Sequence, residues 1–193
     1  MAREFLITGT GASVGKTTVG CALGFAMRAR GIRVGVMKPV DTRESQDAQS
    51  LALAVGSTMP MELICPFRYR ADSAHAESPN LANIARCFDE IAAQSDVMLV
   101  ESANVIDFTD VAATLKLEVI VVVGNRPGCV DAARLSIQRC EDRGLKIAGC
   151  ILCDCDPNPA VDEASLRELF GSFYLGRMRH REPLAKAIVE KLV

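Results

Sequence analysis

Short runs of aliphatic and β-branched residues alternate along this chain with longer stretches in which apolar residues recur every three or four positions. The first pattern predicts buried strands and the second predicts amphipathic helices. The predicted strands are residues 5–7, 32–37, 96–101, 118–124, 146–152 and 173–176, and the predicted helices are residues 17–30, 47–55, 80–94, 107–117, 164–170 and 184–192, with another starting at Pro127. Strands that alternate with helices indicate an α/β fold in which a mostly parallel sheet carries helices on both faces, in three layers.

Two parts of the chain interrupt this alternation. Pro39 follows the second predicted strand, and a proline cannot continue a hydrogen-bonded ladder. Residues 57–79 show neither periodicity and carry Pro60, Pro66 and His75, so we predict an irregular segment in which His75 is a solvated loop residue. The next helix has Ser78 and Asn80 as candidate caps.

Residues 8–18, between the first strand and the first helix, read Thr-Gly-Thr-Gly-Ala-Ser-Val-Gly-Lys-Thr-Thr. A glycine-rich turn between a strand and a helix that ends in Gly-Lys-Thr is typical of a P-loop, which cradles phosphates with backbone N–H groups and the helix N-terminus. The usual pattern places glycine where Thr10 stands, so the loop here is one residue longer and runs from Gly9. We therefore predict a fold of the P-loop NTPase type, with residues 1–193 as a single nucleotide-binding domain.

The roles of the loop residues follow from this motif. Lys16 would reach the terminal phosphates and the Thr17 hydroxyl would bind Mg²⁺. The candidate nucleotide-binding residues are Gly11, Ala12, Ser13, Val14, Gly15, Lys16, Thr17 and Thr18.

Further candidates lie where strands end, because ligands of such sheets bind at the carboxyl ends of the strands. Glu101 closes a buried strand and is placed to hold Mg²⁺ or its water, the alternative being a solvated acid. Lys38 follows the second strand and would neutralise charge on a transferring phosphoryl group, or be a surface lysine. Asp47 and Thr42, in the following segment, have the plainer alternatives of a helix cap and a turn residue.

Composition excludes some classes of function. The 193 residues carry a net charge of −2 and no basic stretch interleaved with aromatic residues, which gives no support to a nucleic-acid or membrane-surface partner. The longest apolar run, residues 119–124, is too short to span a bilayer, and the first strand starts so early that we expect no signal peptide. We expect the eight cysteines of this intracellular-looking chain to be free thiols. Cys150, Cys153 and Cys155 would make a poor metal site, because they lack a fourth ligand.

Five motifs, taken in order, resemble the dethiobiotin synthetase family over most of the chain, up to about residue 154. They are the extended loop from Gly9 to Thr17, Met37-Lys38-Pro39-Val40, Ser45-Gln46-Asp47-Ala48, Leu99-Val100-Glu101 and Gly128-Cys129-Val130-Asp131-Ala132. The Gly-Lys-Thr motif is generic, but the longer loop joined to Lys-Pro-Val is much more specific.

The resemblance implies a cytoplasmic, homodimeric enzyme that makes dethiobiotin from 7,8-diaminononanoate, CO₂ and ATP with Mg²⁺, through a phosphorylated carbamate. It also implies the site: Lys16 on the phosphates, Thr17, Asp47 and Glu101 around Mg²⁺, and Lys38 and Thr42 facing the carbamate. The backbone of Gly128, Cys129 and Val130 would bind the substrate carboxylate, with the helix N-terminus as an anion site. Lys16, Lys38 and Thr42 are thus the candidate catalytic residues.

The chain departs from the family pattern at four places. Ser13 replaces an acid in the loop, and Ser102-Ala103-Asn104-Val105 replaces a Gly-Ala-Gly-Gly segment. Cys153 stands where the family has an asparagine that contacts adenine, and Asp131 replaces an asparagine near the substrate carboxylate. These changes leave phosphate and Mg²⁺ binding intact. They bear on which nucleotide base is bound and whether the diamine is the substrate.

Three alternatives therefore stay open. One is a paralogous enzyme that activates another carboxylate or amine on the same scaffold. Another is a nucleotide switch of the partition or septum-placement type, although such proteins usually have a lysine where Gly11 stands. The third is a regulatory domain with an inactive site, against which the intact Lys16 and Thr17 argue.

Overall fold

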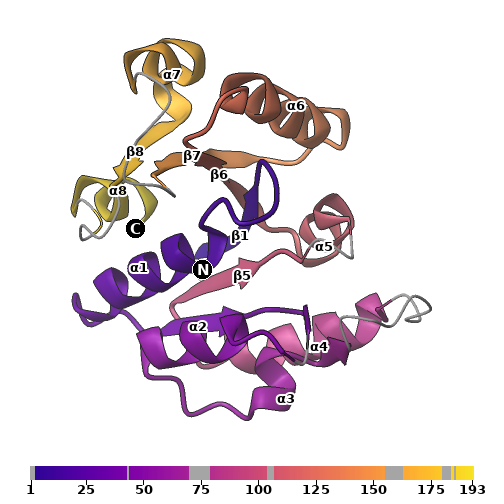
Figure 1. The fold of residues 1–193 in the computed structure, drawn as a ribbon. Helices are drawn as coiled ribbons and strands as arrows, with labels where there is room; N and C mark the ends of the chain where they lie inside the picture. The colour runs from indigo at the N-terminus through magenta and orange to yellow at the C-terminus, as the bar shows by residue number, and fades with distance from the viewer. Residues whose placement is uncertain are drawn as a thin grey trace.

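Six parallel strands form one sheet in the order β2-β5-β1-β6-β7-β8 (Figure 1). The computed structural model describes residues 3–42, 44–69, 79–103, 107–154, 163–179, 184 and 186–193. The strands of this sheet are β1 (Arg3–Gly9), β2 (Val34–Met37), β5 (Val97–Glu101), β6 (Glu118–Gly124), β7 (Ile147–Cys153) and β8 (Tyr174–Met178). β1 lies between β5 and β6, so the loop that follows it opens at the centre of the sheet edge.

Helices cover both faces of the sheet, which confirms the predicted three-layer α/β fold (Figure 1). One face carries α1 (Lys16–Arg28), α2 (Asp47–Val55) and α8 (Lys186–Leu192). The other carries α3 (Met61–Ile64), α4 (Leu81–Ala92), α5 (Phe108–Leu115), α6 (Cys129–Asp142) and α7 (Glu163–Phe170), the last followed by a 3₁₀ turn at Gly171–Phe173.

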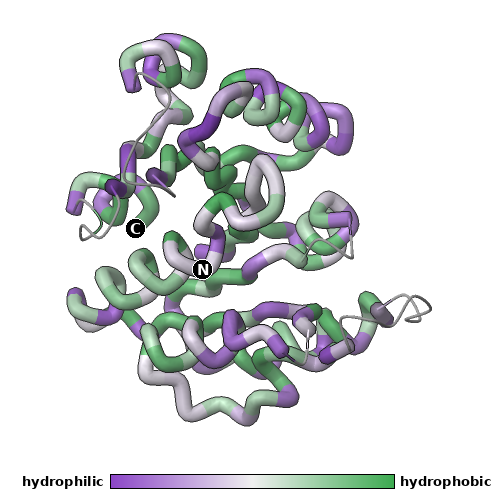
Figure 2. Tube along the Cα trace, viewed as in Figure 1, coloured by the Kyte–Doolittle hydropathy of each residue, from purple (hydrophilic) through white to green (hydrophobic). Residues whose placement is uncertain are grey.

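The strands contribute side chains to two hydrophobic cores, one on each side of the sheet. In β1, Phe5 and Ile7 pack with α1 and α8, whereas Leu6 between them packs with the opposite layer. β6 divides in the same way, because successive side chains of a strand point to opposite faces. Strands that are buried on both faces consist mostly of hydrophobic residues, and the inner strands are therefore mostly green in Figure 2.

The segment predicted to be irregular contains regular structure that the sequence did not indicate. Within residues 57–69 the chain forms α3 and β4 (Phe67–Tyr69), and β4 pairs in parallel with β3 (Val40–Thr42) in a separate two-stranded sheet. A strand of three residues is too short to show a period of two, and its partner lies more than twenty residues away. Pro39 does end β2, but pairing resumes at once in β3; His75 and Ser78 lie outside the described residues.

The remaining predicted elements are present, with bounds that differ by a few residues. Asn80 caps α4 by accepting hydrogen bonds from the backbone N–H groups of Ala82 and Asn83. The helix predicted from Pro127 begins at Cys129, because Gly128 takes the left-handed conformation (φ 77°) as its N-cap.

Candidate functional site

The loop between β1 and α1 has the backbone that phosphate binding requires. Gly15, the N-cap of α1, has φ 94°, and a Cβ built on it would lie 2.5 Å from Cys153 Sγ. Only glycine fits both the conformation and the space. Ser13 is also left-handed, with φ 53°, and successive turns of this kind direct N–H groups into one concave surface. Gly11, Ala12, Ser13 and Thr18 are exposed, and Val14 is buried beneath the loop.

Lys16 is the first residue of α1, and its ammonium donates to Gly11 O at 3.3 Å across the loop. Burial lowers the pKa of Lys16, with Glu101 opposing this effect and Lys38 adding to it. The ammonium therefore lies against the loop, and Lys16 and Gly11 line the same cavity.

An arginine that the sequence analysis did not single out supports this loop from outside. Arg126 follows β6, the neighbour of β1, and its guanidinium donates to Ala12 O at 3.4 Å and to Ser13 O at 2.7 Å. These contacts hold two loop carbonyls outward while the N–H groups stay free to face a ligand. Its position after a strand next to β1 is the signal that could have identified it.

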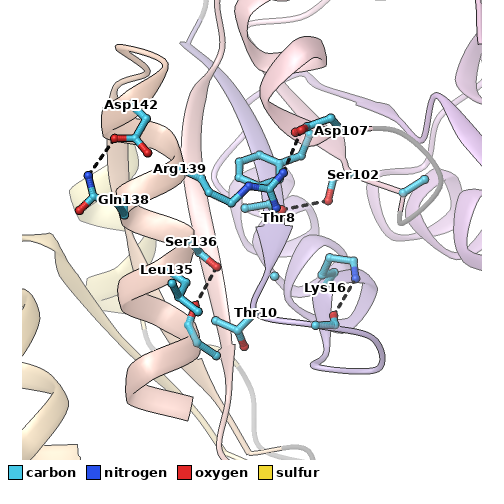
Figure 3. A pocket seen from close by; sticks show the side chains of 15 residues that line it. Thr8, Thr10, Lys16, Ser102, Asp107, Leu135, Ser136, Gln138, Arg139 and Asp142 are labelled. Atoms are coloured by element: carbon cyan, nitrogen blue, oxygen red, sulfur yellow. Dashed lines mark hydrogen bonds and ion pairs between the residues drawn. The ribbon is translucent and has the colours of Figure 1, made fainter. Parts of the chain in front are cut away.

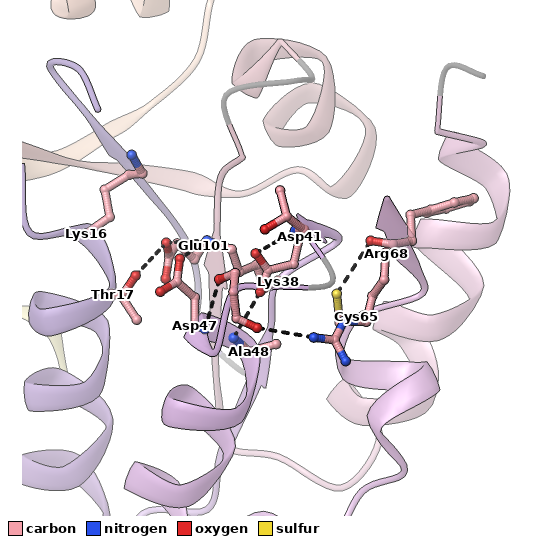
Figure 4. A network of polar contacts seen from close by, with 12 residues as sticks. Lys16, Thr17, Lys38, Asp41, Asp47, Ala48, Cys65, Arg68 and Glu101 are labelled. Atoms are coloured by element: carbon pink, nitrogen blue, oxygen red, sulfur yellow. Dashed lines mark hydrogen bonds and ion pairs between the residues drawn. The ribbon is translucent and has the colours of Figure 1, made fainter. Parts of the chain in front are cut away.

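A polar cluster adjoins the loop where β2 and β5 end. Met37 pairs with Val100, so the residues that follow them, Lys38 and Glu101, leave neighbouring strands side by side. The Lys38 ammonium lies 2.6 Å from Glu101 Oε1 and 3.0 Å from Asp47 Oδ2, and Thr17 Oγ1 donates to Glu101 Oε1 at 2.9 Å (Figure 4). The fold therefore brings together four of the residues that the sequence identified, from β1–α1, β2, α2 and β5.

Electrostatics in this cluster are dominated by burial and by ion pairing. The Lys38 and Glu101 side chains are only 6% and 1% exposed. Burial raises the pKa of Glu101, and the Lys38 ammonium and Thr17 hydroxyl oppose that rise. Burial acts to lower the pKa of Lys38, but the Glu101 and Asp47 carboxylates outweigh it, so the pKa lies above its ordinary value and the ammonium stays charged.

Asp41, which the sequence analysis passed over, positions Asp47. The Asp41 carboxylate is buried and accepts hydrogen bonds from the backbone N–H groups of Thr42 at 2.9 Å and Ala48 at 3.4 Å. It thereby ties β3 to the first turn of α2. Asp47 is not the cap of that helix: its own N–H donates to Ser45 Oγ, and its carboxylate is directed at Lys38.

The donor set fits a magnesium ion. Thr17, Asp47 and Glu101 supply only oxygen atoms, the ligands that Mg²⁺ prefers. Glu101 Oε2 is buried and has no hydrogen-bond partner among the described residues, which is costly for a carboxylate oxygen unless a cation reaches it. No group of three or more His, Cys, Asp or Glu side chains in the described ranges could hold a metal alone, so phosphate and water would have to complete the shell.

A cavity of about 720 Å³ adjoins the loop (Figure 3). Its walls come from the loop and Lys16, from Ser102 and Ala103 after β5, and from α5 and α6. Arg139 of α6 pairs with Asp107 at 2.9 Å and stacks on the Phe108 ring at 4.9 Å, which joins the two helices. Of the sequence-predicted site residues, only Gly11 and Lys16 line this cavity.

Two predicted contacts are not among the residues that line the cavity. Thr42 sits in β3, half-buried, near the Lys38 cluster, and the Gly128–Val130 backbone forms the start of α6. The Cys129 N–H already donates to Arg126 O at 3.0 Å. The α6 residues that line the cavity run from Ala132, in the first turn of the helix, to Asp142.

The seven described cysteines are free thiols, as predicted, and Cys155 lies outside the described residues. Cys153 is 3% exposed and packs beneath Gly15 instead of presenting its thiol at a base site.

Across the described ranges, the helices are all too short or too polar for a membrane span.

Comparison with known proteins finds one matching family model and relatives that share one name. A family model described as an AAA domain matches residues 3–187. The protein named ATP-dependent dethiobiotin synthetase from Anaeromyxobacter dehalogenans (strain 2CP-C) is 35% identical, over 95% of this chain and 88% of the relative. Its namesake from Xylella fastidiosa (strain 9a5c) is 33% identical, over 93% of this chain and 91% of the relative.

Solved structures with the same fold are more distant in sequence. The MinC:MinD cell division protein complex of Aquifex aeolicus matches with a TM-score of 0.66 at 15% identity, over 98% of this chain and 86% of that one. A ParA family ATPase from Chlorobium tepidum matches with a TM-score of 0.64 at 15% identity, over 100% and 89%. At such identities these matches show the fold alone.

Proposed function

Since this chain belongs to the dethiobiotin synthetase family, we propose that it is an ATP-dependent ligase that closes a cyclic urea from 7,8-diaminononanoate and CO₂. One amine of the substrate adds to CO₂ and loses a proton, giving a carbamate. A carbamate oxygen attacks the γ-phosphorus of ATP and releases ADP. The second amine then attacks the carbamyl carbon, and phosphate leaves with the closure of the ring.

The single observation that supports this proposal is the cluster of Lys38, Asp47, Glu101 and Thr17 next to a phosphate-binding loop. Phosphoryl transfer depends mostly on positioning and on charge stabilisation, for which fixed cations and backbone N–H groups are suited. The loop from Gly11 to Gly15 would bind the triphosphate through its N–H groups, with Lys16 on its terminal phosphates. Thr18, exposed on α1, would extend the phosphate contacts.

Thr17, Asp47 and Glu101 are the residues that would hold Mg²⁺ in this proposal. The ion, when bound, would neutralise charge on the phosphates between which the bond breaks. Lys38 and Thr42 would face the carbamate, with Lys38 stabilising the charge of the transferring phosphoryl group. The backbone at Gly128, Cys129 and Val130 would hold the substrate carboxylate from the N-terminus of α6.

The family resemblance also supports a homodimer in the cytoplasm. In that arrangement the start of α6 in one subunit would serve the loop of its partner.

A direct assay tests the proposed reaction. Purified protein supplied with diaminononanoate, bicarbonate and Mg·ATP should form dethiobiotin, detected by mass spectrometry, with one phosphate released per product. Glu101→Gln should lower the rate by about a hundredfold or more, the scale expected when a charge-stabilising group is lost. Glu118→Gln, at the opposite end of the sheet, is the matched control and should change little. Absence of product, where a known synthetase works, would refute the proposal.

Asp131 favours a second candidate, a related ligase with another amine substrate. It lies exposed in the first turn of α6, where its charge would repel a substrate carboxylate held at Gly128–Val130. Phosphate release with another amine but not with diaminononanoate would support this candidate.

A further inference from the structure

The cation site of this protein already contains a cation, the ammonium of Lys38 (Figure 4). Its Nζ bridges Glu101 Oε1 and Asp47 Oδ2, the same two carboxylates that the proposed function assigns to Mg²⁺. The Thr17 hydroxyl, the third proposed ligand, donates its proton to the same Glu101 oxygen. Each of the three proposed ligands thus has one atom engaged within the protein, while Glu101 Oε2 has no hydrogen-bond partner among the described residues.

The Lys38 ammonium opposes metal binding at the same two carboxylates. The Thr17 hydroxyl keeps its lone pairs while it donates to Glu101, so the competition lies between the metal and the Lys38 ammonium. An ammonium within 3.0 Å of both carboxylates would also lie within a few ångströms of a doubly charged ion, in a buried place where repulsion is poorly screened.

We propose that Lys38 holds the place of Mg²⁺ in the free protein, and that metal binding displaces its ammonium from Glu101 and Asp47 toward the reacting groups. This inference rests on the proposed function for the identity of the ligands. It adds an order to the reaction: Lys38 becomes available to the substrate only after Mg·ATP has bound.

The fold allows this movement to be confined to one side chain. The Lys38 backbone N–H donates to Ile64 O at 2.8 Å, and Pro39 follows, so the main chain is fixed. The flexible four-carbon side chain of Lys38 separates this fixed backbone from the ammonium. In the free protein the ammonium also prevents two carboxylates, one of them buried, from remaining unpaired.

Binding of Mn²⁺ without nucleotide, followed by electron paramagnetic resonance, tests the competition. Lys38→Met keeps the length of the side chain and removes its charge, so the metal no longer displaces an ion pair. Its Mn²⁺ dissociation constant should fall by about tenfold or more. Lys146→Met, which removes an exposed lysine just before β7 at the other end of the sheet, should bind Mn²⁺ as the unaltered protein does. An unchanged or weaker affinity in Lys38→Met would overturn the proposal.

A crystal structure of the unaltered protein with Mg²⁺ and a non-hydrolysable ATP analogue shows whether the Lys38 ammonium moves or only weakens metal binding by repulsion. This experiment does not depend on the folding of a variant. Lys38 Nζ should then lie beyond hydrogen-bond distance of Glu101 Oε1. Retention of both carboxylate contacts beside a bound metal would contradict the proposal. Neither experiment contains the amine substrate, so a protein that makes no dethiobiotin can still pass both.

Discussion

The Asp96 carboxylate shows how one side chain fastens the edge of the sheet. Its Oδ2 accepts from both the backbone N–H and Nε of Arg33 at 3.0 Å, and its Oδ1 accepts from Nη2 of the same guanidinium. Arg33 precedes β2 and Asp96 precedes β5, so this pair joins the starts of two neighbouring strands. The guanidinium hydrogen bonds, and then the backbone N–H, lower the pKa of Asp96 to about 2.

This shift predicts how the stability depends on pH. Because the folded pKa lies below the ordinary value of 3.8, the pair contributes stability above that value and loses it as the pH falls through about 2. Asp96→Asn should therefore lower the urea midpoint at pH 5 and above, and the difference from the unaltered protein should shrink between pH 4 and pH 2.5. Urea unfolding at several pH values measures this, and a difference that is constant with pH would contradict it.

At the scale of elements, the contact between α1 and α2 depends on the absence of side chains. A Cβ at Gly24 would lie 2.5 Å from Val55 Cγ1, so the helices approach at this glycine. The approach matters for the site, because α1 carries Thr17 and α2 carries Asp47. The spacing between the two helices helps to set the distance between two of the proposed metal ligands.

Gly24→Ala should therefore destabilise the fold. Alanine gains about 1 kcal/mol in helix propensity over glycine, but overpacking costs roughly 1–3 kcal/mol, because the β-branched Val55 cannot turn away freely. In a Val55→Ala background the clash is gone, and Gly24→Ala should become neutral or stabilising. Denaturant unfolding of the four proteins of this cycle measures the coupling, and purely additive effects would refute the packing argument.

At the scale of the whole molecule, the site gathers residues from both halves of the chain. The loop after β1, the ends of β2 and β5, the start of α2 and Arg126 after β6 converge at one edge of the sheet. A nucleotide bound there would contact several elements at once, and a ligand that binds only the folded state stabilises the fold.

Mg·ATP at a hundredfold excess over its dissociation constant should add about 2.7 kcal/mol of stability. For a chain of this size that corresponds to a rise of roughly 5–10 °C in Tm. Lys16→Ala should abolish most of the rise, whereas Lys146→Ala should retain it, as differential scanning fluorimetry can show. An equal rise in both variants would mean that the loop is not where the nucleotide binds.

Local patterns in the sequence were enough to predict the fold class, the main strands and helices, and most of the polar cluster. The P-loop motif and the continuous hydrophobic runs of the strands can each be recognised within a few consecutive residues. A parallel sheet then brings the carboxyl ends of its strands to one edge. Lys38, Asp47 and Glu101 could therefore be identified by residue type and position before their distances were known.

The pairing of these groups, in contrast, depends on contacts between segments that lie far apart in the sequence. The register of β2 against β5 places Lys38 on Glu101, and the buried Asp41 directs Asp47 at the same ammonium. The Arg126 contacts with the loop and the pairing of β3 with β4 likewise join segments far apart in sequence. Such contacts depend on packing across many residues, and no local period or motif encodes them.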